Sequence, residues 1–314
     1  MNTVSYSAGI DVAKGHLDLY LRPSGHAERF SNDAPGHRKL INVLRKHRVS
    51  LIVLEATGGY ERAAVKAMVA ADLPVHVAQP QTIRAFAKSL NLRAKNDQID
   101  SNVNAQFAEE RAGKLKVIES IDPVQEQLAA LAVRRSQLVE MQTMEQNRVQ
   151  QVADKRAIKN IKQTLKFLAK QIKDVEKQMD DIIKENEKLR EKSAKLQETK
   201  GVGPQTARLL LACLPELGKT SSKRLNALVG VAPYDNESGE HKGHRFIAGG
   251  RKLVRNGLYM ACMSAAHSND VIKPYYVKLV ARGLAHKSAM MACIRKLLNY
   301  LNEQLQPDKS PKTA

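Results

Sequence analysis

The chain has 314 residues, of which 43% are hydrophobic, so it is long enough to bury a core in each of two domains. Lys and Arg number 51 against 32 Asp and Glu, and the resulting formal charge of +19 indicates a polyanionic partner, with nucleic acid favoured over an acidic membrane. Three cysteines without a C-x-x-C pair argue against a disulfide framework and a structural zinc site, and 8 Tyr, 5 Phe and no Trp argue against base stacking as the main mode of binding.

No apolar run approaches the length of a membrane span, and the amino terminus lacks the basic and apolar segments of a secretory signal. We therefore expect a soluble, cytoplasmic protein that grips phosphate backbones and has no membrane partner.

The first part of the chain, to about residue 113, alternates strand-like runs with helical ones. The runs YSAGIDV, HLDLYLR and HAERFS predict three consecutive strands joined by tight turns. Helical stretches and two further strands follow at residues 36–48, 50–56, 60–71, 74–78 and 81–89. Hairpins followed by βα units predict a mixed sheet with helices on its faces.

The second part, residues 123–197, contains no Gly or Pro after its first residue. Its apolar residues repeat at alternating spacings of three and four: Ile158, Ile161, Leu165, Leu168, Ile172, Val175, Met179 and Ile182. Such a heptad seam predicts a left-handed coiled coil that pairs protomers, and the alternative is a long helix packed on its own domain.

A basic stripe lies within this part, because residues 155–173 include seven Lys or Arg and no acid. A stripe of one sign on an extended helix suits a phosphate backbone. Lys159, Lys162 and Lys166 are therefore candidate nucleic-acid contacts, and the alternative is a solvated helix face.

The third part, residues 201–305, predicts a basic helical domain that opens with GVGPQTA. A Gly-x-Gly turn before a helix presents backbone N–H groups to a phosphate, although an ordinary helix start has a similar sequence. Residues 306–314 predict a disordered tail. Four basic residues that follow a Gly-rich loop are candidate backbone contacts, or else a solvated basic face: Arg245, Arg251, Lys252 and Arg255.

Four acids of the first part stand at strand ends and on one helix face. Asp11 and Glu55 end two apolar strands, and acids at the carboxyl ends of adjacent strands point into one crevice. Asp97 and Asp100 are three residues apart, on one face of the helix they begin. Each acid alone suits a structural role, but together they match a site for Mg²⁺, or Mn²⁺ in its place, that serves phosphoryl transfer.

These strings resemble the motifs of the bridge-RNA-guided insertion-sequence transposases with a RuvC-like DEDD domain, the IS110 group and its IS1111 branch, which include pilin-gene invertases. GIDVAKGHLDL matches the first acidic motif, LEATGGYE the second, and AKNDQIDSNVNAQFA the third and fourth. GVGPQTA, LVGVAPYDNESG and IAGGRKLVRNGLYMA match the transposase domain. The resemblance covers nearly the whole chain and is closest to the IS1111 branch.

The resemblance implies an α/β ribonuclease-H-like (RuvC-like) catalytic domain over residues 1–115, a long coiled-coil dimerisation insert over 116–198 and a helical C-terminal transposase domain with a serine loop over 199–305. It implies that Ser238 is the nucleophile and that the DEDD metal ligands are Asp11, Glu55, Asp97 and Asp100. The implied protein is a homodimer or homotetramer, associated with the bacterial nucleoid. The implied reaction is the cutting and exchange of donor and target DNA strands through a phosphoserine, guided by a non-coding bridge RNA.

Two other interpretations remain open. A RuvC-like, metal-dependent nuclease or junction resolvase would hydrolyse DNA with metal and water and leave Ser238 idle. A non-catalytic, coiled-coil, nucleic-acid-binding scaffold would use the acids only for structure.

Overall fold

The computed structural model describes residues 5–92, 97–238 and 241–306, without the side chains of residues 97–98, 237–238 and 241–242. The chain divides into two compact units, Met1–Asp122 and Pro123–Ala314. Within the described ranges, no helix is both long enough and apolar enough to cross a membrane.

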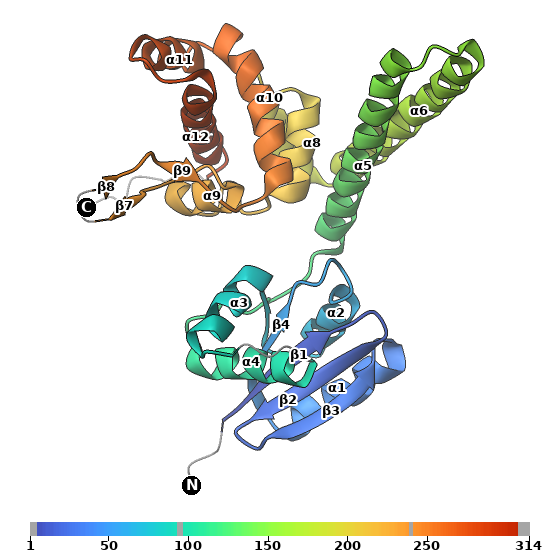
Figure 1. The fold of residues 1–314 in the computed structure, drawn as a ribbon, viewed down its shortest axis with the longest axis vertical. Coiled ribbons are helices and arrows are strands. Elements are labelled where there is room, and N and C mark those ends of the chain that lie inside the picture. Colours follow the sequence, from blue (N-terminus) through green and yellow to red (C-terminus); the bar gives the residue numbers. More distant parts are fainter. Residues whose placement is uncertain (1–4, 93–96, 239–240, 307–314) are drawn as a thin grey trace. The chain divides into compact units, whose positions relative to one another are not determined.

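The first unit is built on a five-stranded sheet with the strand order β3-β2-β1-β4-β5 (Figure 1). Its strands are β1 (Tyr6–Val12), β2 (His16–Arg22), β3 (His26–Ser31), β4 (Val49–Glu55) and β5 (Val75–Ala78). The first three form an antiparallel meander, and β4 and β5 run parallel to β1, so the sheet is mixed, as the sequence predicts. Strand β1 therefore lies at the centre, where the meander meets the βα units.

Helices cover both faces of this sheet: α1 (Ala34–Lys46), α2 (Arg62–Ala70), α3 (Pro80–Ser89) and α4 (Asp97–Glu110). Because side chains alternate along a strand, each strand contributes to two cores. Ile52 and Leu54 of β4 join the core that includes α1 and α2. Leu51 and Val53 join the other core, which includes Phe107 of α4.

The second unit is helical and carries a small β ribbon (Figure 1). Its helices are α5 (Pro123–Gln151), α6 (Lys155–Glu185), α7 (Glu187–Gln197), α8 (Pro204–Cys213), α9 (Ser222–Val229), α10 (Lys252–Ser268), α11 (Ile272–Ala281) and α12 (His286–Gln304). The ribbon pairs β6 (Pro233–Tyr234) with β9 (Phe246–Ile247) and β7 (Glu237–Ser238) with β8 (His241–Lys242). The described part of this unit thus agrees with the helical region expected from the sequence.

The predicted heptad seam lies in a helical hairpin within one chain. Helices α5 and α6 pack against each other (Figure 1), and from Leu168 onward the seam is buried in one cluster with Leu128 and Leu138 of α5. The last buried position is Ile183, whereas the strict heptad expects Ile182, so the buried face follows the 3.6-residue period of a straight helix at this end. The chain itself therefore supplies a partner for much of the seam.

Two Asx caps interrupt what the sequence presents as one continuous helical stretch. Asp154 accepts a hydrogen bond from the backbone nitrogen of Ala157 at 2.8 Å, and Asn186 accepts one from that of Leu189 at 3.1 Å. An Asx side chain at an N-cap satisfies backbone donors that have no intrahelical acceptor, so a new helix begins at each position. The hairpin turn and the start of α7 follow from these two residues.

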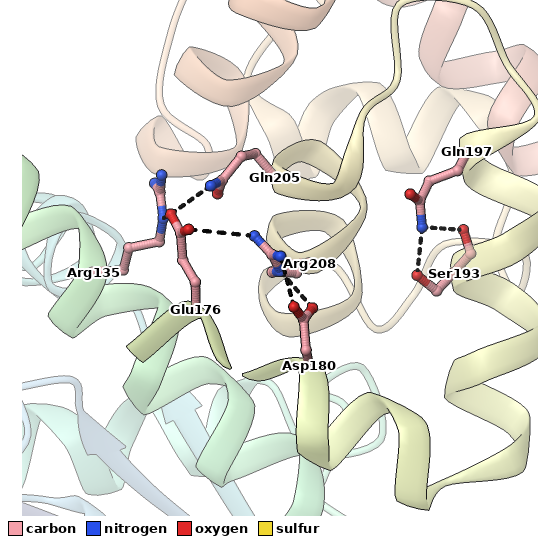
Figure 2. A network of polar contacts seen from close by, with 7 residues as sticks. All are labelled: Arg135, Glu176, Asp180, Ser193, Gln197, Gln205 and Arg208. Atoms are coloured by element: carbon pink, nitrogen blue, oxygen red, sulfur yellow. Dashed lines mark hydrogen bonds and ion pairs between the residues drawn. The ribbon is translucent and has the colours of Figure 1, made fainter. Parts of the chain in front are cut away.

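Charged side chains fix the base of the hairpin to α8 (Figure 2). Arg208 of α8 holds Asp180 of α6 with its Nε and Nη2 atoms at 2.6 and 2.8 Å. Glu176, one turn earlier in α6, accepts a hydrogen bond from Arg135 of α5 at 2.7 Å and another from Gln205 of α8. Three helices are thus tied together by two carboxylates.

Candidate functional site

Asp11 and Glu55 are neighbours at the carboxyl ends of two parallel strands. The register that pairs Ile10 with Leu54 continues to Asp11 beside Glu55, and both acids are half-buried. Val53 belongs to the core that includes α4, and side chains two residues apart share a face of the sheet. Glu55 and Asp11 therefore lie on the face that α4 covers.

Helix α4 lies directly on β1 because Gly9 has no side chain. A Cβ at Gly9 would be 2.1 Å from both the Ser101 oxygen and the Ala105 nitrogen, so any other residue would displace the helix. The buried side chain of Asn104 also donates from Nδ2 to the Ile10 oxygen at 3.1 Å. One close approach and one buried hydrogen bond thus set the position of α4 on the strand that carries Asp11.

Helix α4 runs opposite to β1. Arg22, which pairs with Ser7 near the amino end of β1, donates from Nε to Glu109 Oε2 at 2.7 Å, near the end of α4. The first turn of α4, which contains Asp97 and Asp100, accordingly lies toward the carboxyl end of β1.

The backbone positions of the four predicted acids thus lie toward the same edge of the sheet. The side chain of Asp97 is outside the described residues. Among the side chains that are described, no three His, Cys, Asp or Glu are grouped closely enough to hold a metal ion. The assignment of the four acids as metal ligands stays a prediction.

Asp11 and Glu55 form a row of acids across neighbouring strands, and the structure adds a third acid to this row, Asp18 of β2. Asp18 lies opposite Asp11, and Arg29 of β3 lies opposite Asp18. Arg29 holds Asp18 with its Nε and Nη2 atoms at 2.6 and 2.9 Å, and His16 lies 3.4 Å from the same carboxylate. The alternation in HLDLYLR is the sequence signal for Asp18, because it points polar residues to one face. Arg29 neutralises the acid next to Asp11.

Ser238 stands in the β ribbon, whereas the sequence predicts an irregular polar loop. Ser238 pairs with His241, and further back Tyr234 pairs with Phe246, their rings 6.1 Å apart. The ribbon extends from the helices of the second unit (Figure 1). The side chain of Ser238 is outside the described residues, so its predicted role as nucleophile stays a prediction.

Four basic residues near the ribbon are predicted to contact a nucleic-acid backbone, and two of them have intramolecular roles. Arg251 occupies the N-cap position of α10, and its side chain holds Glu216 with both terminal nitrogens. Arg255 Nη1 donates to the Gly249 oxygen at 2.7 Å and to the Val229 oxygen at 3.2 Å. These bonds shape the turn before α10.

The other two basic residues are exposed. Arg245 forms an ion pair with Asp235 at 2.6 Å, and both of these side chains are more than half exposed. Lys252 is also exposed. A phosphate could therefore reach Arg245 and Lys252 without breaking a buried contact.

The predicted lysines of α6 lie on its exposed face near the turn of the hairpin. Lys159, Lys162 and Lys166 are exposed, and with Lys155 and Ile158 they border a shallow hollow of about 510 Å³. Their ammonium groups share one side of the helix, which suits a polyanion.

The GVGPQTA turn has a packing role. Gly201 has a φ of 98°, and a Cβ there would lie 2.6 Å from Cβ of Ala265 in α10. Gly203 is the N-cap of α8, which begins at Pro204. Gly201 thus allows the turn to pack on α10 before the new helix begins.

Two family models match the chain. The model of the IS110-type DEDD transposases, described as "Transposase", matches residues 8–157, and that of the "Transposase IS116/IS110/IS902 family" matches residues 193–277. Curated relatives include the pilin gene-inverting proteins of Moraxella bovis and Moraxella lacunata, each 24% identical to this chain over 301 residues, with 92% of both chains covered. The first match contains the row of acids and the second contains the ribbon with Ser238.

Proposed function

Because the chain belongs to the IS110 family of transposases and is an enzyme of DNA transposition or recombination, we propose that it cuts and exchanges DNA strands through Ser238, assisted by Mg²⁺ at a DEDD site. The main support for the metal site is that Asp11 lies beside Glu55, on the face of the sheet that α4 covers. Asp97 and Asp100 belong to the first turn of that helix and complete the proposed set of ligands.

The donor chemistry of the row fits a hard cation. Half-buried carboxylates at neighbouring strand ends repel one another, and an ion with oxygen ligands relieves that repulsion. When bound, Mg²⁺, or Mn²⁺ in its place, would polarise the scissile phosphate and favour the ionised form of a nearby hydroxyl. Asp11, Glu55, Asp97 and Asp100 would hold it, and Arg29 keeps the charge of Asp18 from adding to theirs.

The proposed chemistry conserves phosphodiester bonds. The Ser238 hydroxyl attacks the scissile phosphorus and loses its proton, and the bond to one DNA strand breaks, which leaves a phosphoserine and a free strand end. The hydroxyl of a second strand then attacks the phosphoserine, and the serine regains a proton as it leaves. Each cut bond is replaced by a new one, so exchange needs no external energy source.

The proposed partners are DNA and a guide RNA, which the basic charge of the chain and its family both favour. We infer that the basic residues of α6, with Arg245 and Lys252, face the backbones of donor and target DNA and of a guide (bridge) RNA, whereas Arg251 and Arg255 are held by contacts within the chain. Base pairing would then read the sequence, which suits a protein with few stacking aromatics. The active form would be a homodimer or homotetramer in the bacterial cytoplasm, associated with the nucleoid.

The fold proposal is finer than the mixed sheet and helical region described above. The first unit would be a ribonuclease-H-like (RuvC-like) domain, and part of the α5–α6 hairpin would form a coiled coil with a second copy of the chain. This pairing is supported by three seam residues near the hairpin turn that α5 leaves half-buried: Ile158, Ile161 and Leu165.

Isolation of a covalent protein–DNA adduct tests the proposal. The wild-type protein, incubated with its DNA, bridge RNA and Mg²⁺, should yield an adduct whose peptide map places the phosphate on Ser238. Ser238→Ala should give no adduct and no recombination while still binding RNA and DNA. If Ser238→Ala cuts DNA at the wild-type rate, the protein hydrolyses DNA with metal and water instead.

A further inference from the structure

Two short segments directly follow the strands that carry Asp11 and Glu55. Residues 13–15 leave β1 and residues 56–60 leave β4. Asn32, between β3 and α1, lies against both segments. Its Nδ2 atom donates to the Ala13 oxygen at 2.9 Å and to the Tyr60 oxygen at 3.1 Å. One amide group thus joins the segment directly after β1 to the last residue of the segment after β4.

His37 fixes the orientation of the Asn32 amide. His37 Nε2 lies 2.8 Å from Asn32 Oδ1, and because the amide nitrogen already donates to two carbonyls, His37 is the donor in this contact. The imidazole is buried in α1, and burial holds the pKa of His37 below its ordinary value. The neutral ring therefore carries its proton on Nε2, where Asn32 accepts it.

Glu61 fixes the segment after β4 from its other side. Glu61 Oε2 accepts hydrogen bonds from the Thr57 nitrogen and Oγ1, both at 3.1 Å, and from the Gly59 nitrogen at 2.9 Å. Burial alone would raise the pKa of Glu61, but hydrogen bonds from these backbone and hydroxyl groups bring it below its ordinary value. The segment that offers the Tyr60 oxygen to Asn32 is therefore itself held by an ionised carboxylate.

We propose that Asn32, oriented by His37, is a positioning residue that fixes the spacing of Asp11 and Glu55 for a divalent cation. This inference rests on the proposed metal site. Neighbouring carboxylates repel each other before the ion arrives, and ion binding requires ligands held to within a fraction of an ångström. The Asn32 amide links the segments that follow the two strands without itself serving as a ligand, much as outer hydrogen bonds orient metal ligands in other proteins.

Mn²⁺ titration of the full-length protein without nucleic acid tests the proposal, with free Mn²⁺ measured by electron paramagnetic resonance. Asn32→Ala should raise the half-saturating Mn²⁺ concentration about tenfold, the lower end of the effect of removing an outer-sphere partner. His37→Leu should weaken binding in the same direction, and His37→Gln, which keeps a side-chain N–H donor, should restore much of it.

Asn102→Ala is the matched control. Asn102 accepts a hydrogen bond from Arg22 Nη1 at 3.3 Å near the amino end of β1, away from Asp11, so its replacement should leave Mn²⁺ affinity unchanged. Melting temperatures of all variants without metal separate lost binding from lost folding. Should Asn32→Ala fail to fold, the His37→Leu and His37→Gln pair provides the same comparison.

Asp11→Asn separates this inference from the proposed function. If Asp11→Asn loses Mn²⁺ binding and Asn32→Ala binds as the wild type does, the positioning role is wrong and the metal site stands. If Asp11→Asn binds Mn²⁺ as tightly as the wild type, the metal site itself is misassigned and the positioning role falls with it. Strand exchange by Asn32→Ala should also recover at excess Mg²⁺, which a purely structural role does not predict.

Discussion

Arg251 grips Glu216 through two parallel hydrogen bonds, with each terminal nitrogen 2.6 Å from one carboxylate oxygen. Its Nη1 atom also donates to the Cys213 oxygen at 3.0 Å, at the end of α8. Burial alone would raise the pKa of Glu216, but its hydrogen bonds and attraction to Arg251 bring that pKa below its ordinary value. The start of α10 is thereby fixed to the turn after α8.

We expect Arg251→Ala to lower the free energy of unfolding by about 1–2 kcal/mol, since both partners are about one third exposed and solvent screens the pair. Urea denaturation measures this effect. The contribution is present above the ordinary carboxyl pKa of 4.5 and is lost as the pH falls through the lower folded value. Equal stability of the wild type and Arg251→Ala at pH 7 would contradict this role.

Lys252 is the next residue, and its replacement should affect binding rather than stability. Lys252→Ala should reduce the salt dependence of nucleic-acid binding by about one unit of slope, because one phosphate contact is lost for every sequence. Its urea midpoint should match the wild type, since the side chain is exposed. Affinity measured over a series of salt concentrations checks the prediction, and an unchanged slope would mean that Lys252 does not contact a phosphate.

His37 should make the first unit sensitive to mild acid. Its folded pKa is lowered by burial from an ordinary value of 6.5, so the unfolded chain takes up a proton first as the pH falls. Stability is therefore full above pH 6.5 and declines below it. Thermal melts between pH 7.5 and about 5 should show a smaller decline for His37→Gln than for the wild type. Parallel curves would show that protonation of this ring does not contribute.

If the proposed function is right, Asp11→Asn should abolish strand exchange and leave RNA binding largely intact, because the proposed phosphate contacts lie in the basic regions and not at Asp11. In metal-free buffer its melting temperature should not fall, and Asp18→Asn provides the direct comparison. Asp11 lies between two other acids, Asp18 and Glu55, so removing its charge relieves repulsion, whereas removing the charge of Asp18 leaves Arg29 without its ion pair. A sharp drop for Asp11→Asn would indicate a structural acid.

Two substitutions in the hairpin test folding and the proposed pairing of protomers separately. Leu168 is buried between α5 and α6, so Leu168→Ala should cost about 2–5 kcal/mol by leaving a cavity. Ile161 is half-buried near the hairpin turn, so Ile161→Ser should leave the fold intact and weaken the proposed pairing of protomers through the seam. Light scattering and far-ultraviolet circular dichroism, measured together, distinguish the two effects. An unchanged mass for Ile161→Ser would place the contact between protomers elsewhere.

Local pattern predicted the first unit well. The alternation in HLDLYLR and its neighbours, bounded by Gly turns, gave β1, β2 and β3 at the same residues in the sequence and in the structure. What local pattern could not predict is contact at long range. Nothing near Gly9 indicates that α4 lies on it, and nothing near Asp18 indicates Arg29 as its partner.

In the second unit, too, the sequence pattern does not identify which segments contact each other. A heptad seam indicates that an apolar stripe needs a partner, but not whether that partner is α5 or another copy of the chain. The two-residue strands around Ser238 are too short for a recognisable alternation, so the ribbon reads as a loop in the sequence. Glu216 gives no local sign that it will pair with Arg251, 35 residues later.

The late position of α4 in the chain has a consequence during synthesis. Asn104 meets Ile10 across 94 residues, so the sheet can form before the helix that covers it has been made. Until then, Leu51 and Val53 lack part of their covering core, and a nascent chain exposes an apolar face to chaperones or to aggregation. Docking of α4 on Gly9 closes that face and, under the proposed mechanism, brings in Asp97 and Asp100. Under that mechanism, a chain released before α4 has been made lacks two of the four proposed metal ligands.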